Sequence, residues 1–235
     1  MPGKYVARLI RQEAAAFQTG TFYFERPADF RFTAGQSIEI ALAVSDAPES
    51  DRIHTFSICS APYEDHIAIT TRLRDSPFKR ALRLLKPDDT VEVEGPYGKF
   101  VVTRETPRPV VFLVGGVGIT PAMSIIKDVA RDSRLAGVYV FYSNRTAAEA
   151  PFLEQLNHLR AEHSGFHLIA TMTADHSWSG EKERVSMEMV RRYLDPSGAS
   201  FYTSGPPSMV KAMREMLEHC SVPRGQIWSE SFLGH

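Results

Sequence analysis

Residues 110–121 read VVFLVGGVGITP, an apolar, β-prone run that passes directly into a glycine-rich turn and a proline. An uninterrupted apolar run of this length is typical of a strand buried on both faces of a parallel sheet. Glycines at the turn, Gly115, Gly116 and Gly118, would let backbone N–H groups approach a diphosphate at a helix N-terminus. The third glycine of the dinucleotide fingerprint is missing, so a strand-to-helix turn without a ligand is an equal alternative.

The second half of the chain repeats this order of strand and helix. Further strands are predicted at residues 137–143, 166–172 and 199–205, and helices are expected to begin near Pro121, Ala147, Val185 and Ser208. The alternation predicts a parallel sheet with helices on both faces. Residues 204–210, SGPPSMV, follow the last of these strands. This loop and the glycine turn could flank one crevice at the carboxyl ends of the strands, and the two together are more specific than either loop. The alternative for the second loop is a proline-rich turn before a helix.

The first hundred residues follow a different pattern. Short β-prone runs occur at residues 5–10, 20–25, 37–42, 55–59, 66–73 and 90–95. Their spacing predicts an antiparallel barrel, with one short helix capped by Ser76 and begun by Pro77. A charged, proline-containing connector at 103–109 separates the two patterns. We therefore expect an antiparallel β-barrel domain over 1–105 and an α/β parallel-sheet domain over 106–235.

Composition excludes several classes of protein. The 235 residues are 43% hydrophobic and 23% charged, with 27 Lys and Arg against 28 Asp and Glu, as in an ordinary globular protein. This balance gives no electrostatic reason to expect nucleic acid or an anionic membrane as a partner. The two cysteines, Cys59 and Cys220, are too few for a disulfide scaffold, a four-cysteine zinc site or an iron–sulfur cluster. Because the first residues lack a signal-peptide pattern, we expect a cytoplasmic protein. We also expect a monomer without a metal site.

The first half of the chain contains two further motifs, RIHTFSICSAP at 52–62 and GPYGKF at 95–100. With them the chain resembles the ferredoxin-NADP reductase family of flavoproteins along nearly its whole length. The family's motifs occur in the same order, as FTAGQ at 32–36, FSICSAP at 56–62, GPYGKF at 95–100, GGVGITP at 115–121 and SGPP at 204–207. The resemblance implies FAD on the barrel and NADP or NAD on the second domain.

The resemblance also implies a function. Hydride would pass from the nicotinamide to flavin N5, and electrons would continue to a separate ferredoxin-like iron–sulfur protein or flavodoxin. Two other functions stay open: an electron-transfer subunit of a larger complex, and an NAD(P)H flavin reductase acting on small acceptors. A chain whose flavin site has decayed, leaving a nucleotide-binding module, is a third possibility.

Site residues follow from the matched motifs. Ser57 would hydrogen-bond flavin N5, and Ser204 and Glu230 would complete the hydride-transfer environment. The cofactor contacts on the barrel side are His54, Thr55, Phe56, Ser57, Arg72, Ser76 and Lys79, with His54, Arg72, Ser76 and Lys79 at the FAD phosphates. Those on the second domain are Gly115, Gly116, Gly118, Thr120, Pro121, Ser143, Arg145, Gly205 and Pro206, followed by Phe232 and His235 near the end of the chain. Outside these motifs, Phe56 would be an ordinary core aromatic residue and Ser57 a solvated hydroxyl.

Three residues depart from the family pattern. His54 replaces an arginine, so diphosphate binding should be weaker or pH-dependent unless another cation, such as Arg52, substitutes. Ser204 replaces a cysteine, which should alter positioning of the nicotinamide without abolishing the reaction. His235 replaces an aromatic residue that stacks on the flavin, and a disordered tail is an equal alternative. Glu230 could relay protons or be an exposed acid.

The nucleotide preference depends on the end of the strand predicted at 137–143. An acidic residue there would bind a ribose hydroxyl and favour NAD, whereas an arginine accommodates a 2′-phosphate. The chain has Ser143 and Arg145 at this place and no acid between them. The sequence therefore favours NADP.

Overall fold

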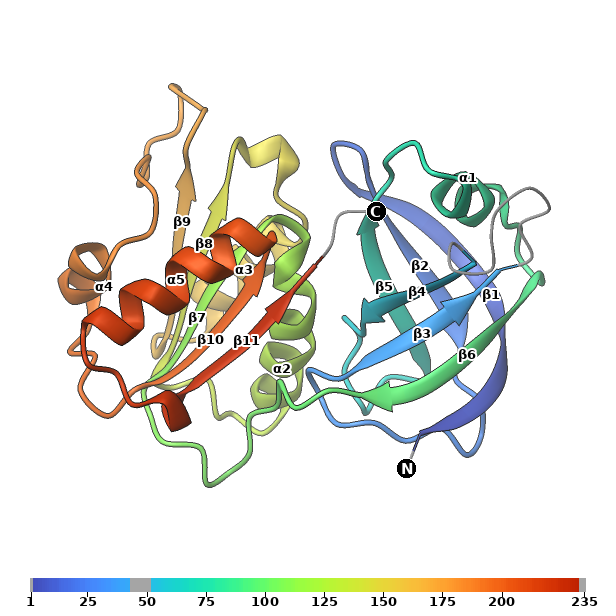
Figure 1. Cartoon of the computed structure of the whole chain (residues 1–235), viewed down its shortest axis with the longest axis horizontal. Helices are drawn as coiled ribbons and strands as arrows, with labels where there is room; N and C mark the ends of the chain where they lie inside the picture. Colours follow the sequence, from blue (N-terminus) through green and yellow to red (C-terminus); the bar gives the residue numbers. More distant parts are fainter. Residues whose placement is uncertain (1, 43–51, 233–235) are drawn as a thin grey trace.

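The computed structural model describes residues 2–42 and 52–232, and Figure 1 shows them folded into two domains that lie side by side. The first domain contains the strands β1 (Gly3–Ala16), β2 (Thr19–Glu25), β3 (Ser37–Ala41), β4 (Ile53–Ser57), β5 (His66–Arg72) and β6 (Thr90–Tyr97). They pair antiparallel in the order β4-β3-β6-β1-β2-β5. An antiparallel bridge joins Ile58, directly after β4, to Ile69 of β5, so the two outermost strands meet and the sheet closes into a barrel.

One helix, α1 (Pro77–Leu84), lies at the top of the barrel in Figure 1. The Ser76 hydroxyl caps it by accepting a hydrogen bond from the Lys79 backbone N–H at 3.3 Å. Phe78 and Leu82, four residues apart, point from one face of the helix into the barrel core. The helix predicted from the Ser76 cap is confirmed.

The second domain is built on a parallel sheet. Its strands are β7 (Val110–Gly115), β8 (Val138–Asn144), β9 (Phe166–Met172), β10 (Ser200–Gly205) and β11 (Ile227–Ser231). They lie in the order β11-β10-β7-β8-β9, so β7 is central and the chain reverses direction across the sheet on either side of it. Ligands of open α/β sheets bind at such a switch point, outside the carboxyl ends of the strands.

Helices cover both faces of this sheet. They are α2 (Ile119–Arg131), α3 (Leu153–Glu162), α4 (Met187–Tyr193) and α5 (Pro207–His219), with the short 3-10 turns η2 (Gly116–Gly118), η3 (Ala147–Glu149) and η4 (Arg224–Gln226). Residues of α2 and α3 share one apolar cluster with the sheet, and residues of α4 and α5 share another. No helix in the described ranges is long and apolar enough to cross a membrane.

The predicted fold class is confirmed for both domains, and the differences are local. The sequence does not predict β11, because its residues, IWSES, show only a short apolar start. The helix expected near Ala147 begins at Leu153, since residues 147–149 form η3 and Phe152 has a left-handed φ of 62°. The predicted boundary near residue 105 falls in the connector between β6 and β7.

Hydrogen bonds join the two domains at several places. The Ser124 hydroxyl of α2 donates to the Ser60 carbonyl oxygen at 2.6 Å. At the tip of the β1–β2 hairpin, the Phe17 N–H donates to the Ala148 carbonyl oxygen of η3 at 2.7 Å. The hairpin thus reaches past the barrel and holds η3 beside it. These contacts bring the ends of β4 and β5 close to the carboxyl end of the parallel sheet.

Candidate functional site

A cleft of about 570 Å³ opens between the two domains. The barrel contributes residues of β4, β5 and α1, and the second domain contributes the carboxyl ends of β7, β8 and β10 with the loops that follow them. The lining residues are His54, Thr55, Phe56, Ser57, Thr70, Thr71, Arg72, Arg74, Lys79, Gly115, Gly116, Val117, Thr120, Ser143, Asn144, Arg145, Thr173, Gly205, Pro206, Pro207, Met209 and Phe232. We call this space the interdomain cleft.

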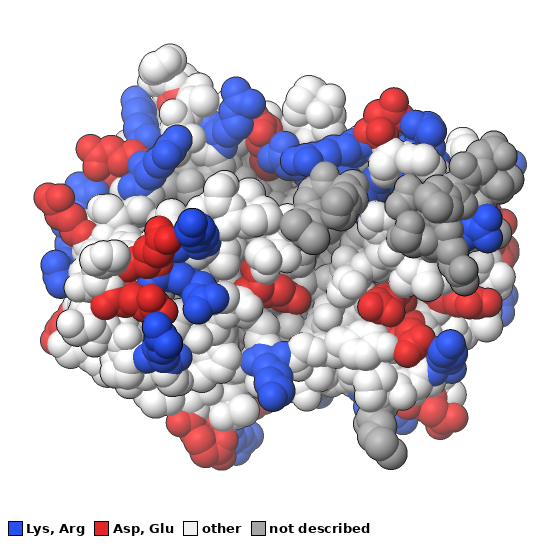
Figure 2. Space-filling view, viewed as in Figure 1, with Lys and Arg blue, Asp and Glu red and all other residues white. Residues whose placement is uncertain are grey.

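The charge of the interdomain cleft is positive. Four basic residues from both domains line it, namely Arg72, Arg74, Lys79 and Arg145, and none of the described lining residues is acidic. Figure 2 shows Lys and Arg side chains along the upper edge of the hollow between the two lobes. A cleft of this charge attracts anions, and phosphate groups are the anions that arginine and lysine bind best. Residues 2–42 and 52–232 contain no cluster of side chains suited to a metal ion.

Lys79 is a buried cation in the wall of the cleft. Its side chain points inward from α1, only 3% of the residue is exposed, and its Nζ donates to the Thr71 hydroxyl at 2.7 Å. The ammonium lies 4.4 Å from the ring centre of Phe56. Burial, with a smaller contribution from the charge of Arg74, lowers the pKa of Lys79 to about 7. Among the described residues no acid pairs with it, so an anion in the cleft would restore its charge.

His54 occupies the same wall. Its ring packs against Phe78 of α1, with ring centres 4.2 Å apart, and it lines the cleft beside Thr55 and Phe56. Arg52, the other residue considered for the missing arginine charge, is exposed and is not among the lining residues. Lys79, which the sequence already places at the FAD phosphates, is a cationic side chain that lines this wall beside His54.

Ser57 and Glu230 are brought together from positions 173 residues apart. The Ser57 hydroxyl, at the end of β4, donates to Glu230 Oε2 over a long 3.4 Å. Glu230 lies on β11, in register with Ser204 of β10. Burial raises the pKa of Glu230 to about 7, and the hydrogen bond from Ser57 opposes this shift. The carboxyl group can therefore hold a proton close to neutral pH.

Ser204 lies where the two loops of the second domain meet. The residue is fully buried, and its hydroxyl donates to the Gly118 carbonyl oxygen at 2.5 Å. A Cβ atom at Gly118 would lie 2.3 Å from the Ser204 carbonyl oxygen and 2.6 Å from Gly205 Cα, so only glycine fits there. Ser204 and Gly118 hold the two loops of the second domain against each other, and neither lines the cleft.

The glycine turn faces the barrel across the cleft. Gly116 has φ of +55°, a left-handed conformation that favours glycine. The Tyr142 hydroxyl donates to the Gly116 carbonyl oxygen at 3.1 Å and fixes the turn from inside the domain. The Thr120 hydroxyl donates to the Val117 carbonyl oxygen at 2.9 Å at the start of α2. At Gly115 and Gly116 the turn therefore presents backbone to the cleft, with Val117 and Thr120 beside it.

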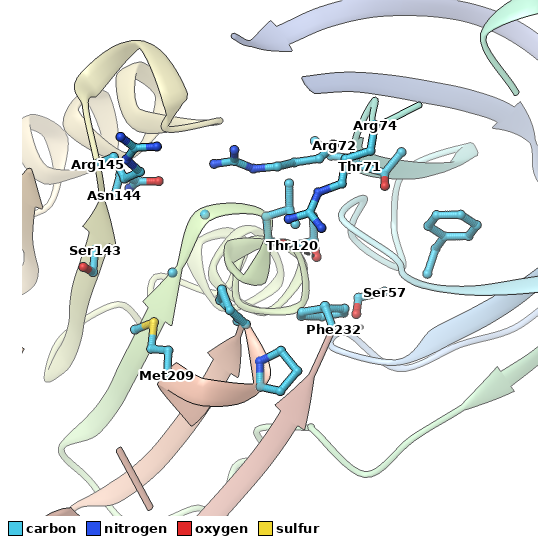
Figure 3. Close-up of a pocket in the computed structure, with 18 of the residues that line it drawn as sticks. Ser57, Thr71, Arg72, Arg74, Thr120, Ser143, Asn144, Arg145, Met209 and Phe232 are labelled. Carbon is cyan, nitrogen blue, oxygen red and sulfur yellow. Dashed lines mark hydrogen bonds between the residues drawn. The ribbon is translucent and has the colours of Figure 1, made fainter. Parts of the chain in front are cut away.

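Asn144, at the end of β8, carries unused hydrogen-bonding capacity. It is 6% exposed, and neither atom of its amide group makes a hydrogen bond within the described ranges. Figure 3 shows its side chain beside Arg145, on the side of the cleft that the Arg72 side chain reaches from the barrel. An unpaired buried amide is costly, so a polar ligand in the cleft is its natural partner.

Known proteins are similar to this chain in sequence and in fold. The oxidoreductase NAD-binding domain family matches residues 112–215. The reductase component of phenol 2-monooxygenase from Pseudomonas sp. (strain CF600) is 28% identical over 216 residues, which are 88% of this chain and 59% of that protein. The FAD/NAD-binding domain of nitric oxide dioxygenase from Vibrio cholerae has a TM-score of 0.84 at 24% identity, covering 97% of this chain and 98% of that one. Residues 112–215 therefore match an oxidoreductase NAD-binding domain, and the fold of nearly the whole chain is similar to that of an FAD/NAD-binding domain.

Two further comparisons define the extent of the likeness. The ferredoxin-NADP reductase of Neisseria gonorrhoeae, solved with bound FAD and NADP, has a TM-score of 0.82 at 22% identity and is covered over 98% of its length. NADH-cytochrome b5 reductase 1 of Neosartorya fischeri is 28% identical over 210 residues, or 84% of this chain and 67% of that protein. The chain spans 59% of the length of the phenol 2-monooxygenase component and 57% of the length of the propane 2-monooxygenase reductase component of Rhodococcus jostii (strain RHA1), which is less than two thirds of each.

Most residues expected from the family motifs line the interdomain cleft: His54, Thr55, Phe56, Ser57, Arg72, Lys79, Gly115, Gly116, Thr120, Ser143, Arg145, Gly205, Pro206 and Phe232. Those that do not line it are Ser76, which caps α1, Gly118, Pro121, Ser204 and Glu230. His235 lies outside the described residues. Glu230 still reaches the site through Ser57.

Several lining residues are missed by reasoning from the family motifs. They are Thr70, Thr71, Arg74, Val117, Asn144, Thr173, Pro207 and Met209. Asn144 could have been found, because it stands between Ser143 and Arg145 at a strand end. Thr173 directly follows the strand predicted at 166–172, and Met209 lies in the loop at 204–210, so their positions in the chain also carried a signal.

Proposed function

We propose that the chain is a flavoprotein oxidoreductase that holds FAD against the barrel, takes hydride from NAD(P)H held against the second domain, and passes electrons to a separate acceptor. The observation that carries the proposal is the interdomain cleft, which combines cations from both domains with the glycine turn and the end of β4. Two phosphate-bearing ligands would face each other there. The names of several relatives, as reductase components of oxygenases, support a separate acceptor.

The barrel wall fits the diphosphate of FAD. Lys79 is a buried cation with no acidic partner among the described residues, which is a costly arrangement unless an anion binds beside it. His54 and Thr71 line the same wall, and Phe56 offers a ring beneath the ammonium. Lys79 would thus take the role of the arginine that His54 replaces.

The second domain fits a nicotinamide nucleotide. The Gly116 turn opens α2, where backbone N–H groups and the helix dipole favour phosphate. The unpaired amide of Asn144 would gain its hydrogen bonds from the same ligand. Ser143 and Arg145 line the cleft, and no acid is among the described lining residues. We propose NADP as the preferred nucleotide on this basis.

When bound, FAD would supply the group that accepts hydride and can give up the two electrons one at a time. The residues of the chain would position the reacting rings and hold or release a proton. Ser57 has a hydroxyl in the cleft wall, and its donated hydrogen bond connects it to Glu230. Because the pKa of Glu230 is about 7, its Oε2 can hold or release a proton near neutral pH. Phe232 lines the cleft next to β11 and helps to exclude water.

The acceptor is proposed to be a ferredoxin-like iron–sulfur protein or a flavodoxin. The chain has only Cys59 and Cys220, too few to ligate a cluster of its own. Cys59 is buried, and burial raises the pKa of its thiol to about 11, so it is not a reactive thiolate. Electrons leaving the flavin would therefore pass to a cluster or flavin outside this chain.

Anaerobic stopped-flow absorbance of the purified protein tests the proposal. Mixing with NADPH should bleach the flavin band rapidly, and mixing with NADH should bleach it more slowly. A flavin band that neither nucleotide bleaches would instead favour a dependent electron-transfer subunit. Absence of bound flavin after addition of FAD would refute the function.

Steady-state assays separate the remaining alternatives. The isolated chain should reduce ferricyanide with NADPH, and adding a ferredoxin with cytochrome c should produce ferredoxin-dependent cytochrome reduction. Reduction of free flavins at the same rate as ferricyanide, without any stimulation by ferredoxin or flavodoxin, would identify a flavin reductase for small acceptors.

A further inference from the structure

Tyr142 is a buried tyrosine whose hydroxyl lies behind the glycine turn. It belongs to β8, which pairs with β7, the strand that ends in the turn (Figure 1). The residue is fully buried, and burial raises the pKa of its phenol, so the hydroxyl keeps its hydrogen. The hydroxyl lies 3.1 Å from the Gly116 carbonyl oxygen and 3.0 Å from the Pro151 carbonyl oxygen, and it can donate to either. One hydroxyl therefore joins the turn to the segment that leads into α3.

The position of the Gly116 carbonyl group decides where the next N–H group points. The peptide unit between Gly116 and Val117 is trans and planar, so its C=O and N–H bonds point in opposite directions. Because the Gly116 carbonyl oxygen faces the buried Tyr142 hydroxyl, the Val117 N–H is directed away from the interior of the domain. Gly116 and Val117 both line the interdomain cleft. The N–H group is therefore directed to the side on which an anion would bind.

The Tyr142 hydroxyl restrains a part of the backbone that is otherwise free to rotate. Gly116 has φ of +55°, and glycine has more conformational freedom than any other residue. Inside the turn, the Gly116 carbonyl oxygen accepts from the Ile119 N–H, which is shared with the Val117 carbonyl oxygen. Tyr142 adds a partner from a neighbouring strand, and its ring is packed in the apolar cluster between the sheet and α2. The tyrosine is thus a fixed point against which the turn is held.

We propose that Tyr142 is a positioning residue for nucleotide binding: its hydroxyl holds the Gly116 carbonyl oxygen inward and so presents the Val117 N–H to the diphosphate of the nicotinamide nucleotide. This inference rests on the proposed function and assigns a role to a residue outside the lining of the interdomain cleft. Tyr142 does not touch the nucleotide. Without its hydroxyl the peptide unit can rotate, and part of the binding free energy is lost because the nucleotide must order the turn.

The test compares two tyrosines that differ in what their hydroxyls hold. Tyr142→Phe removes the hydroxyl and keeps the ring in the core. The matched control is Tyr202→Phe, because Tyr202 is fully buried in the same apolar cluster and its hydroxyl donates to the Val101 carbonyl oxygen, in the connector between the domains, at 2.8 Å. Binding of oxidised NADP⁺ and NAD⁺ to the FAD-loaded proteins is measured by isothermal titration calorimetry, so the readout does not depend on hydride transfer.

Tyr142→Phe should weaken binding of both nucleotides by the same factor, because each carries the diphosphate. The factor should be about three- to tenfold, as expected for the loss of one neutral hydrogen bond. In stopped-flow experiments the rate of flavin reduction at saturating NADPH should be unchanged, and only the NADPH concentration needed for half of that rate should rise. Tyr202→Phe should bind both nucleotides like the wild type. The unfolding temperature should fall by a similar amount in the two variants, with FAD retained in both.

A double-variant cycle tests whether Tyr142 acts through the turn. Gly116→Ala places a side chain on a left-handed backbone and so disturbs the turn directly. In the Gly116→Ala background, Tyr142→Phe should weaken nucleotide binding less than it does in the wild type, because the conformation that the hydroxyl holds is already disturbed.

Four results would overturn the proposal. Nucleotide affinity could be unchanged in Tyr142→Phe, or Tyr202→Phe could lose as much affinity, which would indicate a general effect of stability. A loss confined to NADP⁺ would place the effect at the 2′-phosphate. Additive losses with Gly116→Ala would show that Tyr142 does not act through the turn. Failure of the proposed function is distinguishable from all four, because the wild-type protein would then bind no FAD or no nucleotide, and the inference would fall with it.

Discussion

Replacing Lys79 with methionine tests how the barrel wall binds a diphosphate. Methionine keeps an unbranched side chain against Phe56 and removes the charge. The pKa of Lys79 falls from 10.5 to about 7 because the side chain is buried, so at pH 8 most molecules of the apoprotein carry a neutral lysine. A bound diphosphate favours the charged form, so FAD binding above pH 7 should take up a proton. The affinity for FAD should be highest below pH 7 and fall as the pH rises.

The number of protons taken up on binding sets how steeply the FAD affinity falls with pH. If one proton is taken up with each FAD, the affinity falls about tenfold per pH unit, or up to about 100-fold between pH 7 and pH 9. At pH 6 Lys79 is already charged in the apoprotein, so no proton is taken up there. Lys79→Met should bind FAD about 10- to 100-fold more weakly than the wild type at pH 6, through loss of the charge-assisted contact, and should show no pH dependence.

The assay is titration of apoprotein with FAD from pH 6 to pH 9, followed by flavin fluorescence. Proton uptake can be measured in parallel with an indicator dye in weak buffer, with about one proton per FAD expected at pH 8. His54→Gln is the matched control on the same wall, since the sequence alone makes His54 the titrating group. If Lys79 is responsible, His54→Gln keeps the slope and the proton uptake.

The opposite pattern would refute this reasoning. A slope that survives in Lys79→Met and disappears in His54→Gln would assign the charge to His54. Folding of the variant can be checked independently, because the low pKa of Lys79 also affects stability. Between pH 7 and pH 10.5 the unfolded chain binds the proton that the folded apoprotein has lost, so stability should rise with pH by at most about 1.4 kcal/mol per unit. Lys79→Met should lack this rise.

Three further variants test the rest of the site. Ser57→Ala should slow flavin reduction by NADPH at least several-fold in stopped-flow experiments while FAD stays bound, and an unchanged rate would remove Ser57 from the reaction. Glu230→Gln should flatten the pH dependence of the unfolding temperature. In the folded wild type the pKa of this carboxyl group is raised to about 7, so the stability should fall as the pH rises from about 4.5 to 7. A decline that persists in the variant would contradict the burial of this acid. Arg145→Ala should weaken NADPH much more than NADH in steady-state KM measurements, whereas equal losses would argue against a 2′-phosphate contact.

Local patterns determined much of the fold. The Ser76 cap, the proline after it and the spacing of Phe78 and Leu82 specify α1, because each acts on the backbone within a few residues. The apolar run at 110–114 and the glycines after it specify β7 and its turn in the same way. Alternation of strand and helix then limits the second domain to a parallel sheet covered on both faces. β11 was beyond this reasoning, because its five residues become a strand by pairing with β10.

The order of the family motifs also indicated which residues would gather in the cleft, and most of them line it. It did not indicate which of them would face the ligand. Ser204 and Gly118 stand in matched motifs, but they bond to each other through the Ser204 hydroxyl and hold two loops together. A motif indicates which residue type occupies a position. Whether the side chain of that residue points into the cleft or away from it depends on the packing of the folded chain.

By itself, the sequence determined the two-domain architecture, most of the helix and turn positions, and many of the residues that line the cleft. Only the tertiary structure decided the charges and partners of those residues. Arg72 meets Glu149 across 77 positions, Ser57 meets Glu230 across 173, and Lys79 becomes a buried cation beneath Thr71. The reason is physical: backbone preferences are set by near neighbours in the chain, whereas burial and electrostatic contacts depend on segments that meet only when both domains have folded.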